Sequence, residues 1–208
     1  MTDINNFNKN MVNKNIYENF MKLFLQENAK VNLISKNDEK YLWEKHIFDS
    51  ISFEKFYDKY IQEKNGLKLL DIGTGGGFPA IPIAIKYPQI EVTALDSIAK
   101  KIRAVSSVSE SLGLKNLHPV CKRVEHLEEM FDIITSRAVS SLKNISLYAL
   151  PKLKKGGYFV AYKSKKTTEE INEASPIIKN LGGKVIDIIP YKLPLKEELE
   201  RNLIIISK

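Results

Sequence analysis

The stretch Asp71-Ile72-Gly73-Thr74-Gly75-Gly76-Gly77-Phe78-Pro79 decides the fold that we predict for this chain. It follows an apolar run at residues 67–72 and precedes a helical pattern that begins at about Ile81. A glycine-rich turn between a strand and a helix lets a ligand approach the backbone closely. In an open α/β sheet this turn lies at the carboxyl end of the first strand, where ligands bind. Four glycines in positions 73–77 favour a ligand loop over a sharp turn that binds nothing.

The residues around these glycines indicate the chemistry of the ligand. A dinucleotide fingerprint needs a small residue at the sixth position of G-x-G-x-x-G, and counting from Gly73 this position holds Phe78. The Asp71 carboxylate would repel a pyrophosphate but can pair with an amino group, and Asp96 ends the next apolar run, placed to accept both hydroxyls of a ribose. S-adenosylmethionine has an amino group, a ribose and no phosphate, so it is favoured as cofactor over a nicotinamide dinucleotide, which stays the alternative. The predicted cofactor-binding residues of this group are Asp71, Gly73, Gly75, Gly77 and Asp96.

Short apolar runs alternate with helical patterns over residues 67–208. The predicted strands are 67–72, 91–96, 117–121, 131–135, 157–162, 184–189 and 202–206. The predicted helices begin at about 81 and span 99–112, 142–153 and 168–181. This alternation predicts a mostly parallel sheet with helices on both faces. Because no helical period separates the last two runs, we expect them to form an antiparallel pair.

Residues 1–66 have the pattern of helices and form an N-terminal helical extension of the core at 67–208. An amphipathic stripe runs through Tyr17, Phe20, Met21, Phe24 and Leu25. A second helix is predicted to start near Ser35 or Asn37 and to carry Trp43, Ile47 and Ile51, and a third stripe runs from Phe53 to Tyr60. The length of 208 residues fits one domain.

Composition excludes several classes of protein. A single cysteine, Cys121, rules out an internal disulfide and a cysteine metal cluster, and the three histidines lack paired ligand spacing, so no metal is expected. No apolar run reaches the roughly 18 residues that a membrane span needs, and the N-terminus does not resemble a secretory signal. We therefore expect a cytoplasmic monomer. The net charge of +7 indicates either a nucleic-acid partner or a surface coated with lysines.

The end of the fourth predicted strand indicates the target. Enzymes that methylate exocyclic amines carry an Asn/Asp-Pro-Pro-aromatic turn there, whereas this chain has Thr135-Ser136-Arg137-Ala138. Methylation of a pyrimidine C5 needs a cysteine nucleophile, and Cys121 is interpreted as a core residue. Guanine N7 already offers a lone pair, so an enzyme need only position it in line with the methyl group. No general base is then required.

Several segments together resemble one family. They are Asn32-Leu33-Ile34-Ser35, the run from Lys45 to Ser50, the run from Asp71 to Pro82, Leu95-Asp96-Ser97, Arg123-Val124-Glu125, Ser136-Arg137-Ala138 and Ala161-Tyr162-Lys163. In this order and spacing the chain resembles the RsmG (glucose-inhibited division protein B) family, the bacterial 16S ribosomal RNA guanine-N7 methyltransferases. The resemblance implies a class I S-adenosylmethionine-dependent methyltransferase fold, Rossmann-like, with a seven-stranded and mostly parallel sheet.

The resemblance also implies a reaction and roles for single residues. The reaction is methyl transfer to guanine N7 at position 527 of 16S rRNA in the 30S ribosomal subunit. Gly73 and Phe78 are implied to line the cofactor pocket, and Val124 and Glu125 to flank the adenine. Arg137, which we also assign to cofactor binding, is implied to lie at the active site. Lys163 and Arg123 are implied to face RNA.

Further site residues follow from the position of charges. Arg137 ends a predicted strand and can bind guanine O6 or a phosphate, but not N7, which must stay free. Arg137 and Lys163, which follows the fifth predicted strand on the same edge, are the predicted catalytic residues. The predicted RNA-binding residues are Arg123, Lys163, Lys165, Lys100 and Arg201. His46 and Asp49 are interpreted as a structural pair on one helix face. The alternatives to an rRNA methyltransferase are a small-molecule methyltransferase and a non-catalytic RNA-binding module.

Overall fold

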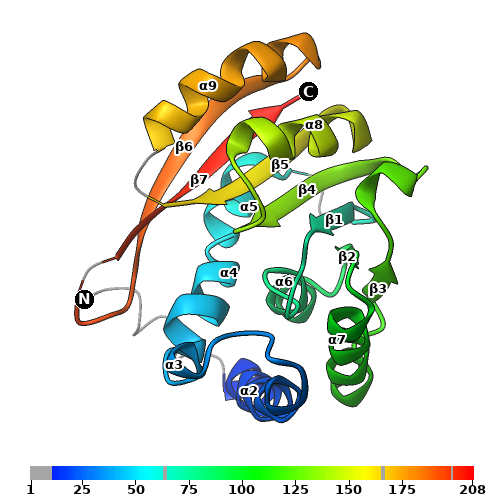
Figure 1. Cartoon of the computed structure of the whole chain (residues 1–208), viewed down its shortest axis with the longest axis vertical. Coiled ribbons are helices and arrows are strands. Elements are labelled where there is room, and N and C mark those ends of the chain that lie inside the picture. Colours follow the sequence, from blue (N-terminus) through cyan, green and yellow to red (C-terminus); the bar gives the residue numbers. More distant parts are fainter. Residues whose placement is uncertain (1–10, 63–64, 165–166, 198) are drawn as a thin grey trace.

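A seven-stranded sheet forms the centre of the computed structural model, which describes residues 11–62, 65–164, 167–197 and 199–208 (Figure 1). The strand order is β3-β2-β1-β4-β5-β7-β6. Neighbouring strands from β3 to β5 are parallel, and β7 is antiparallel to both β5 and β6. The predicted Rossmann-like class and the antiparallel last pair are thus confirmed.

The strands match the predicted apolar runs closely at the start of the core and less closely later. They are β1 (Lys68–Ile72), β2 (Glu91–Asp96), β3 (Leu117–Cys121), β4 (Phe131–Arg137), β5 (Leu153–Lys163), β6 (Lys184–Leu193) and β7 (Leu199–Ser207). The fifth strand begins four residues earlier than predicted, because a register shift between Phe131 and Ile133 lets Leu153 pair with Phe131. The helix before it accordingly ends at Lys152.

Two apolar layers fill the two faces of the sheet, because successive residues of a strand point to opposite faces. On one face, Leu70 and Ile72 pack with helices α8 (Leu142–Lys152) and α9 (Thr167–Asn180). On the other face, Leu69 packs with α6 (Ala80–Lys86), α7 (Ala99–Leu112) and the N-terminal helices. Figure 1 shows α8 and α9 on one side of the sheet and α2, α6 and α7 on the other.

The N-terminal extension differs from its predicted form. Helix α2 (Met11–Val31) carries the predicted stripe, with Phe20 and Phe24 fully buried. The prediction that the second helix is one continuous α-helix was wrong. Ser35 caps a short helix, α3 (Lys36–Glu39), which is followed by a π-helix, η1 (Leu42–Phe48), and two short helices, α4 (Asp49–Ile51) and α5 (Glu54–Tyr60).

A π-helix widens the turn by closing i→i+5 hydrogen bonds, and helix α4, which follows η1, contacts the sheet. The hydroxyl of Tyr162, near the end of β5, donates to the backbone oxygen of Ser50 at 2.9 Å.

Within the described parts of the chain, no helix combines the length and the hydrophobicity that crossing a membrane requires.

Candidate active site

The carboxyl edge of the parallel strands gathers most of the predicted site residues. Gly73 follows β1, Asp96 ends β2, Arg137 ends β4 and Lys163 ends β5. In an open α/β sheet, ligands bind in the crevice outside this edge. Two neighbouring cavities lie here, and Ala138 lines both.

The glycine loop lies against the end of β2. The backbone N–H groups of Gly73 and Thr74 both donate to the carbonyl oxygen of Leu95, at 2.8 and 2.9 Å. Gly73 has a φ of +71°, a conformation that L side chains rarely adopt. A Cβ atom at this position would lie 2.5 Å from a methyl carbon of Val139, in the loop after β4. The left-handed backbone angle therefore favours glycine here, and an added side chain would have to displace Val139.

Asp71 lies behind this loop and is fully buried. Thr135 donates a hydrogen bond of 2.9 Å to Oδ1 of its carboxyl, whereas Oδ2 has no hydrogen-bond partner among the described residues. Burial raises the pKa of this carboxyl to about 6, although the neighbouring hydroxyls of Thr74 and Thr135 act in the opposite direction. Asp71 does not line either cavity.

Asp96 connects the loop to the cavity wall. Its carboxylate accepts hydrogen bonds from the backbone N–H of Gly75 at 3.1 Å and of Ile98 at 2.9 Å. Lys101 lies 3.6 Å from the same carboxylate. Asp96 lines the larger cavity, and only 8% of its surface is exposed. An oriented carboxylate at this position is suited to accept the hydroxyls of a ribose.

The larger cavity has a volume of about 750 Å³, which suits a nucleoside-sized ligand. Gly73, Val124 and Glu125 line it, as predicted for the cofactor pocket. It also has an apolar wall, to which Ile72, Leu95, Val139, Ile145, Leu147 and Tyr148 contribute. The cavity thus combines the oriented carboxylate of Asp96, an apolar wall and the backbone of Gly73. These features fit S-adenosylmethionine.

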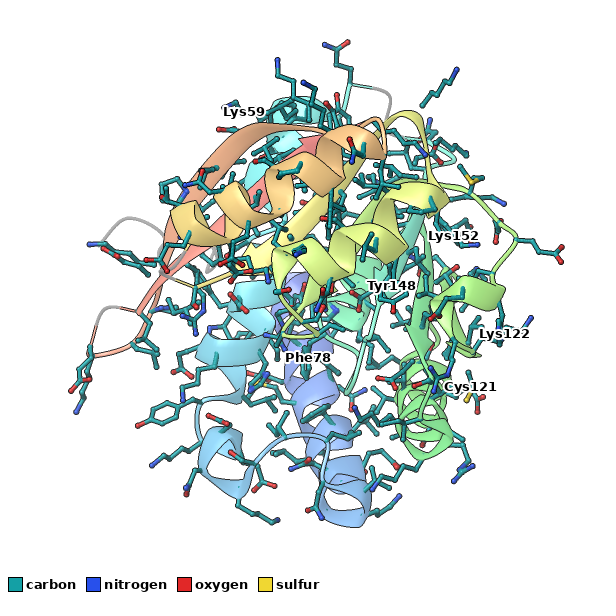
Figure 2. The ribbon with its side chains drawn as sticks, turned by 45° about the horizontal axis from the view of Figure 1, so that its top comes forward. Lys59, Phe78, Cys121, Lys122, Tyr148 and Lys152 are labelled. Atoms are coloured by element: carbon teal, nitrogen blue, oxygen red, sulfur yellow. The ribbon has the colours of Figure 1, made fainter. Side chains whose placement is uncertain are left out.

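Leu147 and Tyr148 were missed by the sequence prediction. They are 46% and 41% exposed, and Figure 2 labels Tyr148 on α8. The buried face of α8 is formed by Leu142, Ile145 and Ala149 with their neighbours. In the sequence, Leu147 and Tyr148 are large apolar residues that fall outside the periodic buried face of this helix. That departure from the helical pattern is the signal that could have identified them as lining residues.

The predicted cofactor residue Phe78 lies elsewhere. It is 3% exposed and is not among the residues that line the larger cavity. Its ring packs against Phe24 and His46, with centroid distances of 5.0 and 5.2 Å. The guanidinium carbon of Arg137 lies 5.3 Å from the ring centroid. Phe78 therefore joins the glycine loop to the N-terminal helices. Gly75 and Gly77 are also absent from the cavity lining.

The second cavity, of about 520 Å³, brings together three of the predicted cationic residues. Arg137, Lys163 and Arg201 line it, with residues of the N-terminal extension opposite. Lys163 donates to the backbone oxygen of Ser140 at 2.8 Å and pairs with Glu170 at 2.7 Å. Its side chain is only 12% exposed. Lys163 thus lies in the cavity wall with a counterion beside it.

The other predicted RNA-binding residues are spread along the surface. Arg123 lines the larger cavity from its exposed position after β3, and Lys100 is exposed on α7. Lys165 lies outside the described residues. Cys121 is exposed, so its interpretation as a core residue was wrong: it ends β3, where the strand leaves the sheet. Figure 2 shows Cys121 and Lys122 at the outer edge of the molecule.

Comparison with known proteins identifies the family of this fold and site. The GidB family model, described as rRNA small subunit methyltransferase G, matches residues 13–199. The chain belongs to this family. Ribosomal RNA small subunit methyltransferase G of Lachnoclostridium phytofermentans is 39% identical over 198 residues, which cover 92% of this chain and 80% of that protein. The protein of the same name from Staphylococcus saprophyticus is 40% identical over 197 residues, with the same coverage.

Solved structures of other proteins have a fold similar to that of this chain. TrmN from Thermus thermophilus has a TM-score of 0.59 at 18% identity, covering 76% of this chain and 48% of that chain. A SAM-dependent methyltransferase from Aquifex aeolicus has a TM-score of 0.58 at 20% identity, covering 82% of this chain and 95% of that chain. The sheet order and these likenesses give the class I methyltransferase fold.

Proposed function

We propose that this chain transfers the methyl group of S-adenosylmethionine to N7 of a guanine in 16S rRNA, at the position that its family implies, 527. Its membership of the rRNA small subunit methyltransferase G family supports the reaction and the substrate class. The observation that carries the proposal is the pair of cavities that meet at Ala138. One is lined by Gly73 and Asp96, and the other by Arg137 and Lys163.

The larger cavity holds the cofactor in this proposal. Asp96 accepts the ribose hydroxyls, and Val124 and Glu125 flank the adenine. Gly73 leaves room for the ligand beside the backbone, while Asp71 supports the loop from behind. When bound, S-adenosylmethionine would supply the sulfonium methyl group that the guanine N7 lone pair accepts. Because that lone pair carries no proton, the chain needs no general base and contributes mainly by positioning.

The smaller cavity receives the target in this proposal. Arg137 donates to guanine O6 or to a neighbouring phosphate and so holds N7 toward the shared wall at Ala138. Lys163 and Arg201 stand beside it, and Arg123, Lys100 and Lys165 extend the contact along the RNA backbone. The chain acts as a monomer on the 30S subunit in the cytoplasm, without a metal ion.

The test is methyl transfer from radiolabelled S-adenosylmethionine to ribosomal subunits from cells that lack this modification. The proposal expects label in the RNA of the small subunit and background label in the large subunit. Arg137→Ala should reduce the rate about 100-fold while the affinity for S-adenosylmethionine changes less than about twofold. Equal label in both subunits would contradict the substrate class. Equal losses of rate and affinity would move Arg137 to the cofactor site.

A further inference from the structure

Arg137 is held by the N-terminal extension and by no residue of its own strand. Its Nη1 atom donates to the backbone oxygen of Lys45 at 3.1 Å and to Oδ2 of Asp49 at 2.9 Å. Its Nη2 atom donates to Nδ1 of His46 at 3.0 Å. All three acceptors belong to residues 45–49, where the π-helix η1 meets α4. The extension therefore contributes every hydrogen-bond partner that the described residues give this side chain, and the ring of Phe78 lies beside it.

These contacts leave part of the guanidinium available. A guanidinium has five N–H donors in one plane, and three of them are taken by the extension. The donor on Nε and one donor on Nη2 have no partner among the described residues. Arg137 lines the smaller cavity, and its side chain is 15% exposed. The three bonded donors fix the plane of the guanidinium, and the other two donors remain available for a ligand.

Asp49 is itself rigidly placed. It is 4% exposed, and its Oδ1 atom accepts a hydrogen bond of 2.6 Å from the hydroxyl of Tyr191, on β6. Its two oxygens thus bind one partner on β4 and one on β6. The buried carboxylate of Asp49 is the counterion of Arg137, and the tyrosine hydroxyl holds this carboxylate in position. Removing it would leave a buried guanidinium without its counterion.

His46 completes the arrangement as a neutral acceptor. Because Nδ1 accepts from Arg137, the ring proton is assigned to Nε2, which is buried and has no hydrogen-bond partner among the described residues. Burial lowers the pKa of His46 to about 4, and the charge of Arg137 contributes in the same direction. The ring also packs on Phe78, at a centroid distance of 5.2 Å. His46 therefore accepts from Arg137 at neutral pH without adding a positive charge.

We propose that Asp49 and His46 are positioning residues for methyl transfer: they fix the plane of the Arg137 guanidinium so that its two free donors face the target guanine. This proposal rests on the proposed function of Arg137. Neither residue needs to touch the target, and both act through the arginine. It assigns the extension a part in the reaction beyond covering the sheet.

The experiment is a double-mutant cycle on kcat for methylation of small subunits. Asp49→Asn should lower kcat about 10- to 100-fold, with the affinity for S-adenosylmethionine within about twofold of wild type. In the background of Arg137→Ala, the same change should have almost no further effect. His46→Gln, which keeps an acceptor, should retain more activity than His46→Leu.

The matched control is Asp187→Asn. Asp187 binds a cation and a tyrosine hydroxyl as Asp49 does, through Lys59 at 2.8 Å and Tyr60 at 2.9 Å, at the start of β6. This change should leave kcat within about twofold of wild type. If the effects of Asp49→Asn and Arg137→Ala multiply, Asp49 acts independently of the arginine and the proposal is overturned.

A second measurement separates this proposal from the proposed function. In NMR spectra of the free protein, the Nη protons of Arg137 should show slow rotation about the Cζ–Nε bond, and Asp49→Asn should make the rotation fast. Fast rotation in the wild-type protein would overturn the positioning role, whatever the substrate. Slow rotation together with no methylation of small-subunit RNA would overturn the proposed substrate and leave the placement of Arg137 intact.

Discussion

Two buried acids near the carboxyl edge are stabilised in different ways. Asp49 has a guanidinium and a tyrosine hydroxyl as partners. Asp71 has the hydroxyl of Thr135, and burial raises its pKa to about 6. Asp49 therefore orients a cation at the smaller cavity, whereas Asp71 lies behind the glycine loop and outside the lining of both cavities. The sequence placed Asp71 at this edge, but the pairing of Asp49 with Arg137 joins residues 88 positions apart and leaves no periodic signal.

Gly73→Asp is expected to abolish binding of S-adenosylmethionine. The new side chain would meet Val139 and place a carboxylate where the ligand approaches. Gly182→Asp is the control, because Gly182 has a φ of +77° with no atom within 4 Å of an added Cβ. Both variants should lose about 1–2 kcal/mol of unfolding free energy from the left-handed backbone. Calorimetric titration should find cofactor binding in the control alone. Normal binding by Gly73→Asp would show that the loop is not the cofactor site.

The lowered pKa of His46 predicts that the stability of the folded chain depends on pH. In the folded chain its pKa is about 4, against about 6.5 in the unfolded chain. The unfolded state therefore binds more protons between these values, and stability is lost as the pH falls from 6.5 to 4, by at most about 3 kcal/mol. Asp71 acts in the opposite sense, since its folded pKa is raised.

The difference between wild type and His46→Leu isolates the contribution of His46. Denaturant unfolding at several pH values should show the wild type losing more stability than the variant as the pH falls to 4. Parallel curves for the two proteins would mean that His46 is not buried as a neutral ring.

At the scale of elements, the N-terminal extension is where prediction from sequence failed. The four-residue spacing of Trp43, Ile47 and Ile51 fits an α-helix, but it does not distinguish an α-helix from a π-helix. The π-helix contacts β4 and β6, and local periodicity contains no information on such long-range contacts. Helix α2 was predictable because its apolar stripe packs on one face of the sheet.

Asn28→Ala is expected to loosen this extension. Asn28 is fully buried, accepts from the backbone N–H of Ile34 at 2.8 Å and donates to Glu39 at 2.7 Å. It thus joins the end of α2 to α3. Because the change leaves the partly buried N–H of Ile34 unpaired, unfolding free energy should fall by about 1–3 kcal/mol. Asn180→Ala, at an exposed site on α9, should change it by less than about 0.5 kcal/mol. Equal stabilities of the two variants would contradict this role.

At the scale of the whole molecule, strand alternation predicted the core well. Each predicted strand of the parallel part appears, and so the residues that follow the strands meet at one edge. The division of that edge into two cavities was not predictable. It depends on Ala138 and on the N-terminal extension that closes the smaller cavity, and both depend on contacts between residues far apart in the chain.

Arg123→Ala is expected to weaken RNA binding mainly through charge. If the exposed guanidinium binds a phosphate, the slope of log K against log salt should become shallower by about 0.7–0.9. Lys59→Ala is the control, because Figure 2 shows Lys59 far from Lys122, the neighbour of Arg123. The slope of this control should match wild type. Filter binding of 16S rRNA at several salt concentrations measures both. The same slope for wild type and Arg123→Ala would remove this residue from the RNA contact.

The measurement that tests the central claim most directly is mapping of the methylated atom. After transfer from S-adenosylmethionine to unmethylated 30S subunits, the RNA is treated with borohydride and aniline, and the cleavage site is located by reverse transcription. The account predicts cleavage at a single guanine of 16S rRNA, since only N7 methylation makes that guanine sensitive. Label in the RNA without such cleavage, or label on another base, would contradict guanine N7 as the target.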